Sequence, residues 1–363
     1  MNRHIIVGGG VIGMLTALEL AQAGERVILF DRAETGRESS WAGGGIVSPL
    51  FPWRYLDSVT KLASWSQSAY PALCAELGEQ TGVDPEYTRS GLILVAPGET
   101  SAAQSWAEKH GNTVISIDRE EFVRLEPEAA RPAAEALWMP DVGQVRNPRM
   151  VRALRKRLDQ LGVQIRTGDA VGQVLQENGR CSGIRSSQGV CQADTVSICA
   201  GAWSSDLLAG LPSPPDIRPI RGQMLLFAAK PGTISRMVLE GSRYVIPRRD
   251  GRTLFGSTIE DVGFEKITTA EARDELYAIA TERFPVLRQF PIEAHWAGLR
   301  PSSPAGVPYV ARHPEIEGLF INAGHFRNGI VLGPASARLA ADLVLGRTPS
   351  LDPAPYAWTA ARG

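Results

Sequence analysis

The fold is decided by His4-Ile-Ile-Val-Gly-Gly-Gly-Val-Ile-Gly13, near the N-terminus of a chain of 363 residues. Its apolar residues predict a short buried strand, and the glycine-rich turn leads into a helical pattern over Met14–Ala23. A tight strand-to-helix turn requires Gly8, and close approach of the backbone to a pyrophosphate requires Gly10. Gly13 lets the helix pack closely on the strand. The stretch therefore predicts a dinucleotide site, at which the helix N-terminus donates amides to phosphates.

The residues that follow this unit bear on which dinucleotide is bound. A second strand, Arg26–Phe30, ends in Asp31, where a carboxylate can accept hydrogen bonds from an unphosphorylated ribose. NAD and FAD are both bound by such units. The small-residue loop Ser39–Ser48 is too extended for the corresponding turn of an ordinary NAD domain. Such a loop suits backbone that packs against a large flat ligand.

Composition and charge exclude several other classes of protein. Hydrophobic residues make up 44% of the chain and charged residues 21%, as in an ordinary folded protein. The 38 Lys and Arg residues nearly balance the 39 Asp and Glu residues, so the overall charge gives no reason to expect nucleic acid or a membrane as partner. We therefore expect a small molecule as the ligand.

The cysteines and histidines predict neither a disulfide scaffold nor a metal site. The four cysteines lack CxxC pairing, so we expect free thiols in a reducing cytoplasm. The five histidines lack the spacing of zinc ligands, and we predict no metal. The uncharged run Ile5–Leu18 contains four glycines, which favours retained structure over a signal peptide. No run approaches the roughly 20 apolar residues that span a bilayer.

Motifs farther along the chain carry a family resemblance. They are Ala200-Gly-Ala-Trp-Ser204, Arg243-Tyr-Val-Ile-Pro-Arg248, Trp296-Ala-Gly-Leu-Arg-Pro301 and Gly324-His-Phe-Arg-Asn-Gly-Ile330. Together with the N-terminal unit and the small-residue loop, they resemble the FAD-dependent amine and D-amino-acid oxidases, which include the sarcosine oxidases. The resemblance covers almost the whole chain, and it is strongest to the bacterial glycine oxidases that supply thiamine biosynthesis.

This resemblance implies FAD as the cofactor. Some sarcosine oxidases attach the flavin through a cysteine in the C-terminal half, but no cysteine follows Cys199, so we expect non-covalent binding. Val171 resembles the position whose backbone holds the adenine. The residues expected at the cofactor are Gly8, Gly10, Val11, Ile12, Gly13, Asp31, Arg32, Ser39, Ser40, Gly44, Gly45, Ile46, Val171, Ala200, Gly201, Trp203, His325, Phe326, Arg327, Asn328, Gly329, Ile330 and Val331.

The C-terminal part of the chain is expected to support the flavin. Leu319–Asn322 predicts a buried strand, Gly324–Asn328 a loop, and Ile330–Leu345 a long helix capped by Gly346. Flavin reduction places negative charge near N1 and the C2 carbonyl. A helix N-terminus at that point favours acceptance of a hydride.

The expected fold class is α/β with an α+β substrate domain. We expect a discontinuous Rossmann-like FAD-binding domain of residues 1–84, 145–216 and 300–363, and a discontinuous substrate-binding domain, mostly antiparallel sheet, of residues 85–144 and 217–299. Substrate is expected where this sheet faces the flavin. Helices are predicted near Ser58–Gly82 and Ala270–Arg283, and the strands of the second domain at Ser90–Ala96, Gly143–Arg146, Pro219–Phe227, Ser242–Ile246, Thr253–Ser257 and Ile292–Leu299.

Four residues are candidates for substrate binding. A carboxylate in a water-poor pocket needs a bidentate guanidinium, and Arg300 resembles the family's carboxylate-binding arginine. Tyr244 resembles the tyrosine that gives the carboxylate a second hydrogen bond, and Arg327 resembles a further arginine on the flavin and substrate side. Ile259 occupies a position where related oxidases carry an apolar side chain over the substrate, and simple core filling explains it equally well.

The resemblance implies oxidative deamination of glycine, and of sarcosine and small D-amino acids, which present the same anchoring groups. Hydride passes from the α-carbon of the neutral amine to flavin N5, the imine hydrolyses to oxo acid and ammonia, and dioxygen yields hydrogen peroxide. This step needs positioning and an electron sink more than an acid/base pair. The resemblance also implies supply of glycine imine for thiamine's thiazole, a functional link to thiazole synthase, and a homo-oligomer.

Three other functions stay open at this point. A D-amino-acid or proline-type dehydrogenase would pass electrons to a quinone at a membrane, although the sequence shows no polybasic run or basic amphipathic helix. A flavoprotein without amine oxidation of its own is disfavoured by the presence of both Arg300 and Tyr244. An NAD-dependent dehydrogenase would lack the yellow colour of bound flavin.

Overall fold

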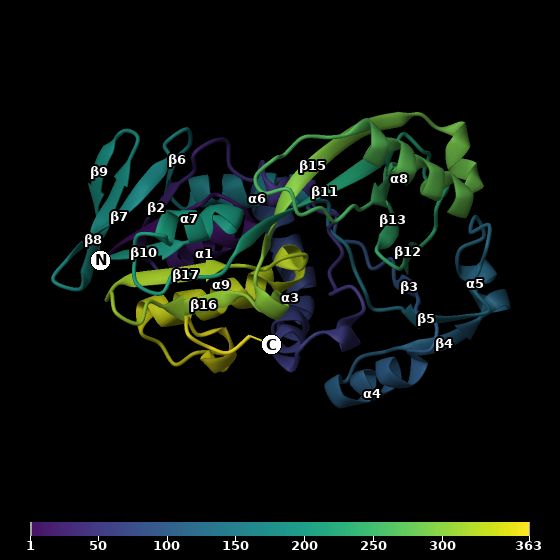
Figure 1. Ribbon diagram of the computed structural model, residues 1–363, viewed down its shortest axis with the longest axis horizontal. Helices are drawn as coiled ribbons and strands as arrows, with labels where there is room; N and C mark the ends of the chain where they lie inside the picture. Colours follow the sequence, from purple (N-terminus) through teal and green to yellow (C-terminus); the bar gives the residue numbers. More distant parts are fainter. Residues whose placement is uncertain (1, 363) are drawn as a thin grey trace.

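Two β-sheets organise the chain, and Figure 1 shows them in separate halves of the molecule. The computed structural model describes residues 2–362. The first half contains a six-stranded sheet with helices packed against it, and the second contains an eight-stranded sheet. The chain passes between the halves several times, and the strands β11 (Arg218–Phe227) and β15 (Ile292–Ser302) extend from one toward the other.

The six-stranded sheet contains the predicted nucleotide-binding unit. Its order is β16-β17-β10-β1-β2-β6. All neighbours are parallel except β16 and β17, which are antiparallel. The strands are β1 (Arg3–Val7), β2 (Arg26–Phe30), β6 (Gln164–Arg166), β10 (Thr195–Ile198), β16 (Tyr309–Arg312) and β17 (Leu319–Ala323).

Alternating side chains bury both faces of this sheet, as the continuous apolar runs of its central strands require. Ile6 and Leu29 pack on one face against helices, whereas Ile5 and Ile28 pack on the other against a small three-stranded sheet. The helices are α1 (Val11–Gln22), α3 (Asp57–Thr81), α6 (Asn147–Gln160) and α9 (Gly329–Leu345). The small sheet comprises β7 (Val171–Glu177), β8 (Arg180–Ser186) and β9 (Gly189–Gln192), and α7 (Ser204–Leu208) lies beside it.

The eight-stranded sheet has the order β15-β11-β14-β13-β12-β3-β5-β4. Its pairs are antiparallel except β12 with β3, which are parallel. Besides β11 and β15, its strands are β3 (Leu92–Val95), β4 (Ile115–Asp118), β5 (Glu135–Met139), β12 (Met237–Glu240), β13 (Arg243–Pro247) and β14 (Thr253–Gly256).

The two faces of this second sheet have different roles. Val245 points toward a core that it shares with α8 (Ala270–Arg283). Its neighbours Tyr244 and Ile246 point to the opposite face and pack with Ile46 from the small-residue loop. The second face therefore meets the nucleotide-binding half. The remaining helices are α2 (Ser39–Ala42), α4 (Thr100–His110), α5 (Arg119–Leu125) and five 3-10 turns at Pro52–Arg54, Gly201–Trp203, Pro285–Gln289, Pro304–Gly306 and Ala354–Tyr356.

The expected α/β fold class with a largely antiparallel second sheet is confirmed. The expected strand at Gly143–Arg146 is wrong. Only Gln144 pairs there, through isolated bridges to Ile46 and Thr88. Helices α4 and α6 and strands β4, β5 and β12 were not among the predicted elements. The domain boundaries stay a prediction. Strand β15 runs across the expected division at residue 300.

Two observations concern membranes and metals. Among residues 2–362, no helix combines the length and apolarity needed to cross a bilayer. In the same part of the chain, no three metal-ligating side chains are grouped as an ion site would require.

Candidate cofactor and substrate site

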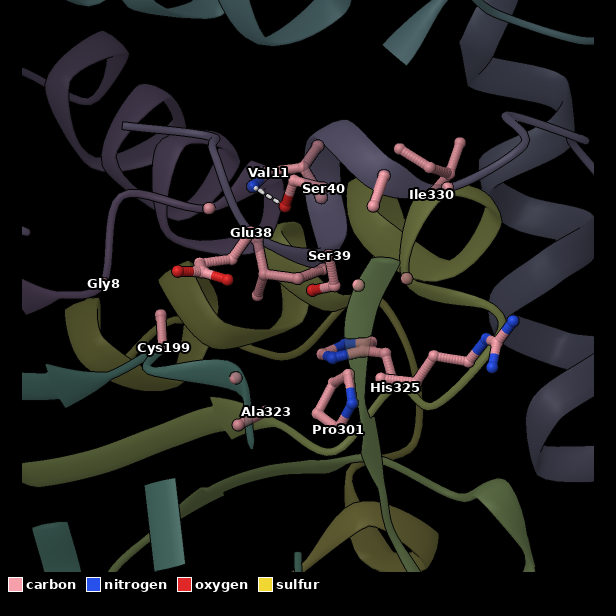
Figure 2. Close-up of a pocket in the computed structure, with 18 of the residues that line it drawn as sticks. Gly8, Val11, Glu38, Ser39, Ser40, Cys199, Pro301, Ala323, His325 and Ile330 are labelled. Atoms are coloured by element: carbon pink, nitrogen blue, oxygen red, sulfur yellow. Dashed lines mark hydrogen bonds between the residues drawn. The ribbon is translucent and has the colours of Figure 1, made fainter. Parts of the chain in front are cut away.

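A pocket lies between the two halves, at the carboxyl ends of β1, β2, β10 and β17. Ligands of open α/β sheets bind at this edge. Its wall comes from both halves, with Gly8 and Ala323 on one side and Tyr244 and Arg300 on the other. Figure 2 shows Glu38, Cys199 and His325 around the space, drawn from segments far apart in the sequence.

In the glycine-rich turn, Gly8 and Gly13 allow close backbone packing, and Gly10 leaves space for a ligand. A Cβ on Gly8 would lie 2.4 Å from the Cys199 carbonyl oxygen, and one on Gly13 would lie 1.9 Å from the Gly8 carbonyl oxygen. Gly13 therefore lies behind the pocket wall and packs α1 on β1. Gly10, by contrast, lines the pocket.

Asp31 is held in place by backbone amides at the end of β2. Its carboxylate accepts hydrogen bonds from the Gly9 and Ala33 amides at 2.8 and 2.9 Å. Burial raises the pKa of Asp31, and these two amides oppose the rise. The residue lines the pocket as a fixed acceptor, which is the role expected of it toward a ribose.

The loop after α2 is fixed from behind. The Ser40 hydroxyl accepts a hydrogen bond from the Val11 amide at 2.8 Å, as Figure 2 shows, and Asn147 Nδ2 donates to the Ser40 carbonyl at 3.0 Å. A Cβ on Gly45, whose φ is +80°, would lie 2.1 Å from the Val145 carbonyl oxygen. A Cβ on Gly44 would meet Ile246 Cδ1 at 2.7 Å. The two glycines thus allow the loop to lie flat between the halves.

Arg300 lines the substrate-domain side of the pocket without an ion-pair partner among residues 2–362. Its guanidinium donates to the Thr258 carbonyl at 3.1 Å and the Ser257 hydroxyl at 2.7 Å, both neutral groups. Burial lowers the pKa of Arg300, which is the cost of keeping a cation out of water. A cation held in this way could receive an anion from outside the chain.

Comparisons with known proteins agree with this geometry. Residues 3–343 match the family described as FAD dependent oxidoreductase. The chain belongs to this family. It is 48% identical over 357 residues to a glycine oxidase of Pseudomonas aeruginosa, with 98% of each chain covered. The crystal structure of glycine oxidase from Geobacillus kaustophilus superposes with a TM-score of 0.94 at 30% identity, covering 100% of both chains.

The matches also include a fused protein. A bifunctional protein ThiO/ThiG of Synechocystis is 32% identical over 356 residues, which is 94% of this chain and 51% of that protein. The expected resemblance to glycine oxidases is confirmed. The enzyme is an oxidoreductase with FAD as its cofactor.

The residues present fit FAD. The first turn of α1 carries no acidic side chain, so nothing in that turn neutralises its N-terminus. The amides of Gly44, Gly45 and Ile46 line the pocket and donate to no group among residues 2–362. Buried amides are nearly always paired in proteins. These amides would be donors for the isoalloxazine ring, and α1 and Asp31 would hold the pyrophosphate and ribose.

The adenosine end carries an interaction that sequence analysis missed. The Arg32 guanidinium lies 3.6 Å from the centre of the Trp203 ring, and Phe264 stacks on the same ring with centroids 5.5 Å apart. The Glu38 carboxylate forms ion pairs with Arg32 Nη2 at 3.2 Å and with Lys266 Nζ at 2.6 Å. A segment of the substrate-domain half thus covers this end of the pocket. Arg32 and Trp203 were expected at the cofactor, but Glu38, Phe264 and Lys266 were not.

His325 is buried and neutral. Burial lowers its pKa to about 3. The Ser336 hydroxyl donates to the Leu332 carbonyl at 2.8 Å, so it is left to accept from His325 Nε2 at 3.0 Å. The following residue, Phe326, has a φ of 47°, and its amide donates to the Pro301 carbonyl at 2.7 Å. The loop before α9 is therefore tied to the end of β15 beside Arg300.

The structure brings most of the predicted site residues to the pocket. Tyr244 lines it 8% exposed, and Arg327 lines it with a buried Nη2 that has no partner among the described residues. Ile259 is placed elsewhere: the residue is 49% exposed and does not line the pocket. On either side of it, Thr258 Oγ1 accepts a hydrogen bond from the Gln223 amide and Glu260 Oε1 accepts one from Gln223 Nε2, so the side chain between them points outward. The other predicted residues outside the lining are Gly13, Asn328 and Val331, which pack behind it.

Several lining residues were not predicted from the sequence. They include Gly222 and Met224 of β11 and Gly298 of β15, strands whose register no local motif reveals. Met224 Sδ accepts a hydrogen bond from the Tyr244 hydroxyl at 3.7 Å. A Cβ on Gly222 would lie 2.1 Å from Arg300 Nη2. Gly222 in β11 is therefore what allows the guanidinium to lie across the sheet.

We expect Gly222→Ala to displace Arg300 while leaving the fold intact, because the atom in conflict is the end of a flexible side chain. The dissociation constant for acetate, a small carboxylate probe followed by the change in flavin absorbance, should rise about tenfold, or ~1.4 kcal/mol. FAD content and thermal stability should remain near those of the parent.

Gly172→Ala is the matched control, because a Cβ at Gly172 would meet nothing within 4 Å. It should leave acetate binding unchanged. An unchanged acetate affinity in Gly222→Ala would contradict the placement of the anion at Arg300.

Proposed function

We propose that this enzyme catalyses the oxidative deamination of glycine, and also accepts sarcosine and small D-amino acids. The products are the imine and then glyoxylate, ammonia and hydrogen peroxide. The observation that carries the proposal is the half-buried guanidinium of Arg300, which has no ion-pair partner among residues 2–362 and lines the pocket of a chain that is 48% identical to a glycine oxidase.

Arg300, Tyr244 and Arg327 are the proposed substrate-binding groups. Arg300 would bind the carboxylate through its guanidinium, which fixes the orientation of the substrate as a lysine would not. The phenol of Tyr244 lies on the same face of the sheet and would donate a second hydrogen bond. Arg327 holds its unpartnered Nη2 on the α9 side, where it would limit how the carboxylate can tilt.

Binding by these residues places the α-carbon for reaction. When bound, FAD supplies the acceptor for the hydride, and dioxygen takes up the two electrons to give hydrogen peroxide. Among the lining residues the neutral His325 cannot serve as a base of ordinary strength, since burial keeps its pKa about 3. The amine must therefore reach the pocket already deprotonated, and the chain contributes position and charge rather than proton transfer.

The proposed biological role is supply of the glycine-derived imine for the thiazole of thiamine. Support comes from the similarity to the bifunctional protein ThiO/ThiG, of which this chain covers 51%. A functional link to thiazole synthase follows from that role. The cytoplasmic location, the homo-oligomer and the two-domain boundaries given above stay predictions.

Oxygen uptake by the purified holoenzyme tests the function. Glycine should be consumed with formation of stoichiometric hydrogen peroxide and ammonia, and sarcosine, D-alanine and D-proline give the order of preference. Anaerobic bleaching of the flavin by an amino acid without oxygen uptake would instead indicate the quinone-linked dehydrogenase. Absence of both responses would leave an FAD protein without amine oxidation and would overturn the proposal.

Arg300→Leu removes the proposed carboxylate receptor. Truncating one side of a buried charge pair costs about 2–5 kcal/mol, so kcat/KM for glycine should fall roughly 30- to 4000-fold, chiefly through KM. Arg218→Leu is the control, because Arg218 lies on the neighbouring strand β11 but pairs with Asp216 at the surface. Kinetics equal to those of the parent in Arg300→Leu would show that the carboxylate binds elsewhere.

The pH dependence of kcat/KM should reflect the substrate amine. Because the neutral amine donates the hydride, kcat/KM should rise with pH until that amine is deprotonated. His325 stays neutral throughout, since its pKa is lowered to about 3, so the profile should lack the inflection near pH 6.5 of an ordinary histidine. Steady-state assays between pH 6 and 10 measure this, and a profile that falls through neutrality would contradict transfer from the neutral amine.

A further inference from the structure

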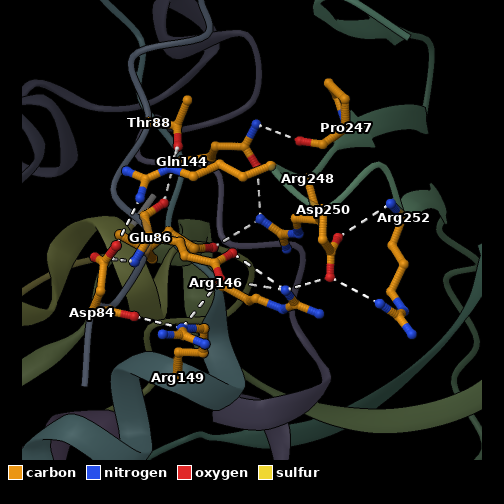
Figure 3. A network of polar contacts seen from close by, with 12 residues as sticks. Asp84, Glu86, Thr88, Gln144, Arg146, Arg149, Pro247, Arg248, Asp250 and Arg252 are labelled. Carbon is orange, nitrogen blue, oxygen red and sulfur yellow. Dashed lines mark hydrogen bonds and ion pairs between the residues drawn. The ribbon is translucent and has the colours of Figure 1, made fainter. Parts of the chain in front are cut away.

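Arg248 is a buried cation whose partners are all uncharged. It follows directly after β13 and is 8% exposed. As Figure 3 shows, its Nη1 donates to Gln144 Oε1, and the bond is 2.6 Å long. Further hydrogen bonds reach the carbonyl oxygens of Val145 at 2.9 Å and Gly44 at 2.7 Å. No carboxylate among residues 2–362 forms an ion pair with Arg248.

The nearby acids are occupied by another arginine. Glu86 and Asp250 pair with Arg146 at 3.3 and 2.8 Å, as Figure 3 shows. Burial and the adjacent Arg146 lower the pKa of Arg248 to about 9, so its guanidinium still carries a charge at neutral pH. Glu86 and Asp250 act on this charge electrostatically, but neither carboxylate is hydrogen-bonded to the Arg248 guanidinium.

The acceptor at Gly44 belongs to the loop against which FAD binds. Its carbonyl and the Gly45 N–H are the two ends of one peptide group. Gly45 is buried and lines the pocket, and its N–H donates to no group among the described residues. Hydrogen bonds in a chain polarise one another, so a cation at the carbonyl end makes the N–H at the other end a stronger donor.

We propose that Arg248 is a positioning residue that raises the reduction potential of the bound FAD through the Gly44–Gly45 peptide. Reduction adds negative charge to the isoalloxazine ring, and donors oriented in advance stabilise that charge. Because its hydrogen-bond partners are neutral, no bonded carboxylate shields the Gly44 carbonyl from the charge of Arg248. The inference concerns the cofactor and does not depend on which amino acid is the substrate.

The hydrogen bond from Arg248 to the Gly44 carbonyl is held in place by neighbouring residues. Gly44 lies against Tyr244 and Ile246 of β13, and a Cβ would come within 3.2 Å of the Tyr244 ring. Gln144 is anchored in turn by donating to the Ser90 hydroxyl at 3.0 Å and the Pro247 carbonyl at 2.8 Å. Strand β13 therefore carries Tyr244, the proposed substrate tyrosine, and Arg248 follows the end of this strand, behind the small-residue loop Ser39–Ser48.

The experiment is an anaerobic titration of the holoenzyme against a reference dye with dithionite, without any amino acid. In Arg248→Met the preference for reduced over oxidised FAD should fall about tenfold, which is a shift of about 30 mV to more negative potential for a two-electron couple. Arg248→Lys keeps the charge and should recover most of the parent potential. Gln144→Glu places a carboxylate against the guanidinium and should shift the potential in the same direction as Arg248→Met.

Arg249→Met is the matched control, because Arg249 pairs with Asp84 at the surface, with 47% of its side chain exposed. It should keep the parent potential. A merely structural role of Arg248 would weaken oxidised and reduced FAD alike and leave the potential unchanged, which would overturn the proposal. If Arg248→Met does not retain FAD, Gln144→Glu decides, and a parent-like potential in that variant overturns the proposal equally.

Discussion

The antiparallel pairing of β11 with β15 is the constraint on which the site depends. Its register places Ile220 opposite Arg300 and Gly222 opposite Gly298. The guanidinium of Arg300 can cross the sheet only because residue 222 has no side chain. A shift of one residue would exchange the faces of every side chain on the strand. The same pairing therefore fixes both the direction of Arg300 and the space it occupies.

This strand also connects the substrate side of the pocket to the cofactor side. Trp296 Nε1 donates to the Ala42 carbonyl at 3.0 Å, and a Cβ on Gly298 would lie 2.5 Å from Ala42 Cβ. Helix α2, which begins the small-residue loop Ser39–Ser48, thus lies directly on β15. At the other end of the strand, the Pro301 carbonyl holds the Phe326 amide in front of α9. One strand consequently sets the position of the substrate arginine relative to two segments that line the FAD pocket.

The sequence predicted those features that depend on neighbours along the chain. The glycine turn, β2 and Asp31 follow from local backbone requirements, and the family motifs pointed to Arg300, Tyr244 and Arg327. The missed features depend on residues distant in sequence: Glu38 meets Lys266 across 228 positions, and Arg248 meets Gly44 across 204. Local periodicity carries no information on such contacts. Ile259 illustrates the same limit, because its outward direction is set by what Thr258 and Glu260 bond to on β11.

Charge is distributed unevenly along the pocket, and this distribution connects binding with chemistry. At the adenosine end Asp31 has no cationic partner among residues 2–362, and Glu38 pairs with Arg32 and Lys266. Arg300, Arg327 and the buried Arg248 lie toward the small-residue loop and the substrate side without an ion-paired carboxylate in the same part of the chain. A carboxylate is attracted to the second end, and an ammonium group is repelled from it. In the proposed function, the field that would bind the acid group also favours the amine in its neutral form, which is the form from which hydride transfer is proposed. The same field would stabilise the negative charge that reduction adds to the cofactor, so that a single set of arginines without ion-paired carboxylates would serve both substrate selection and electron acceptance.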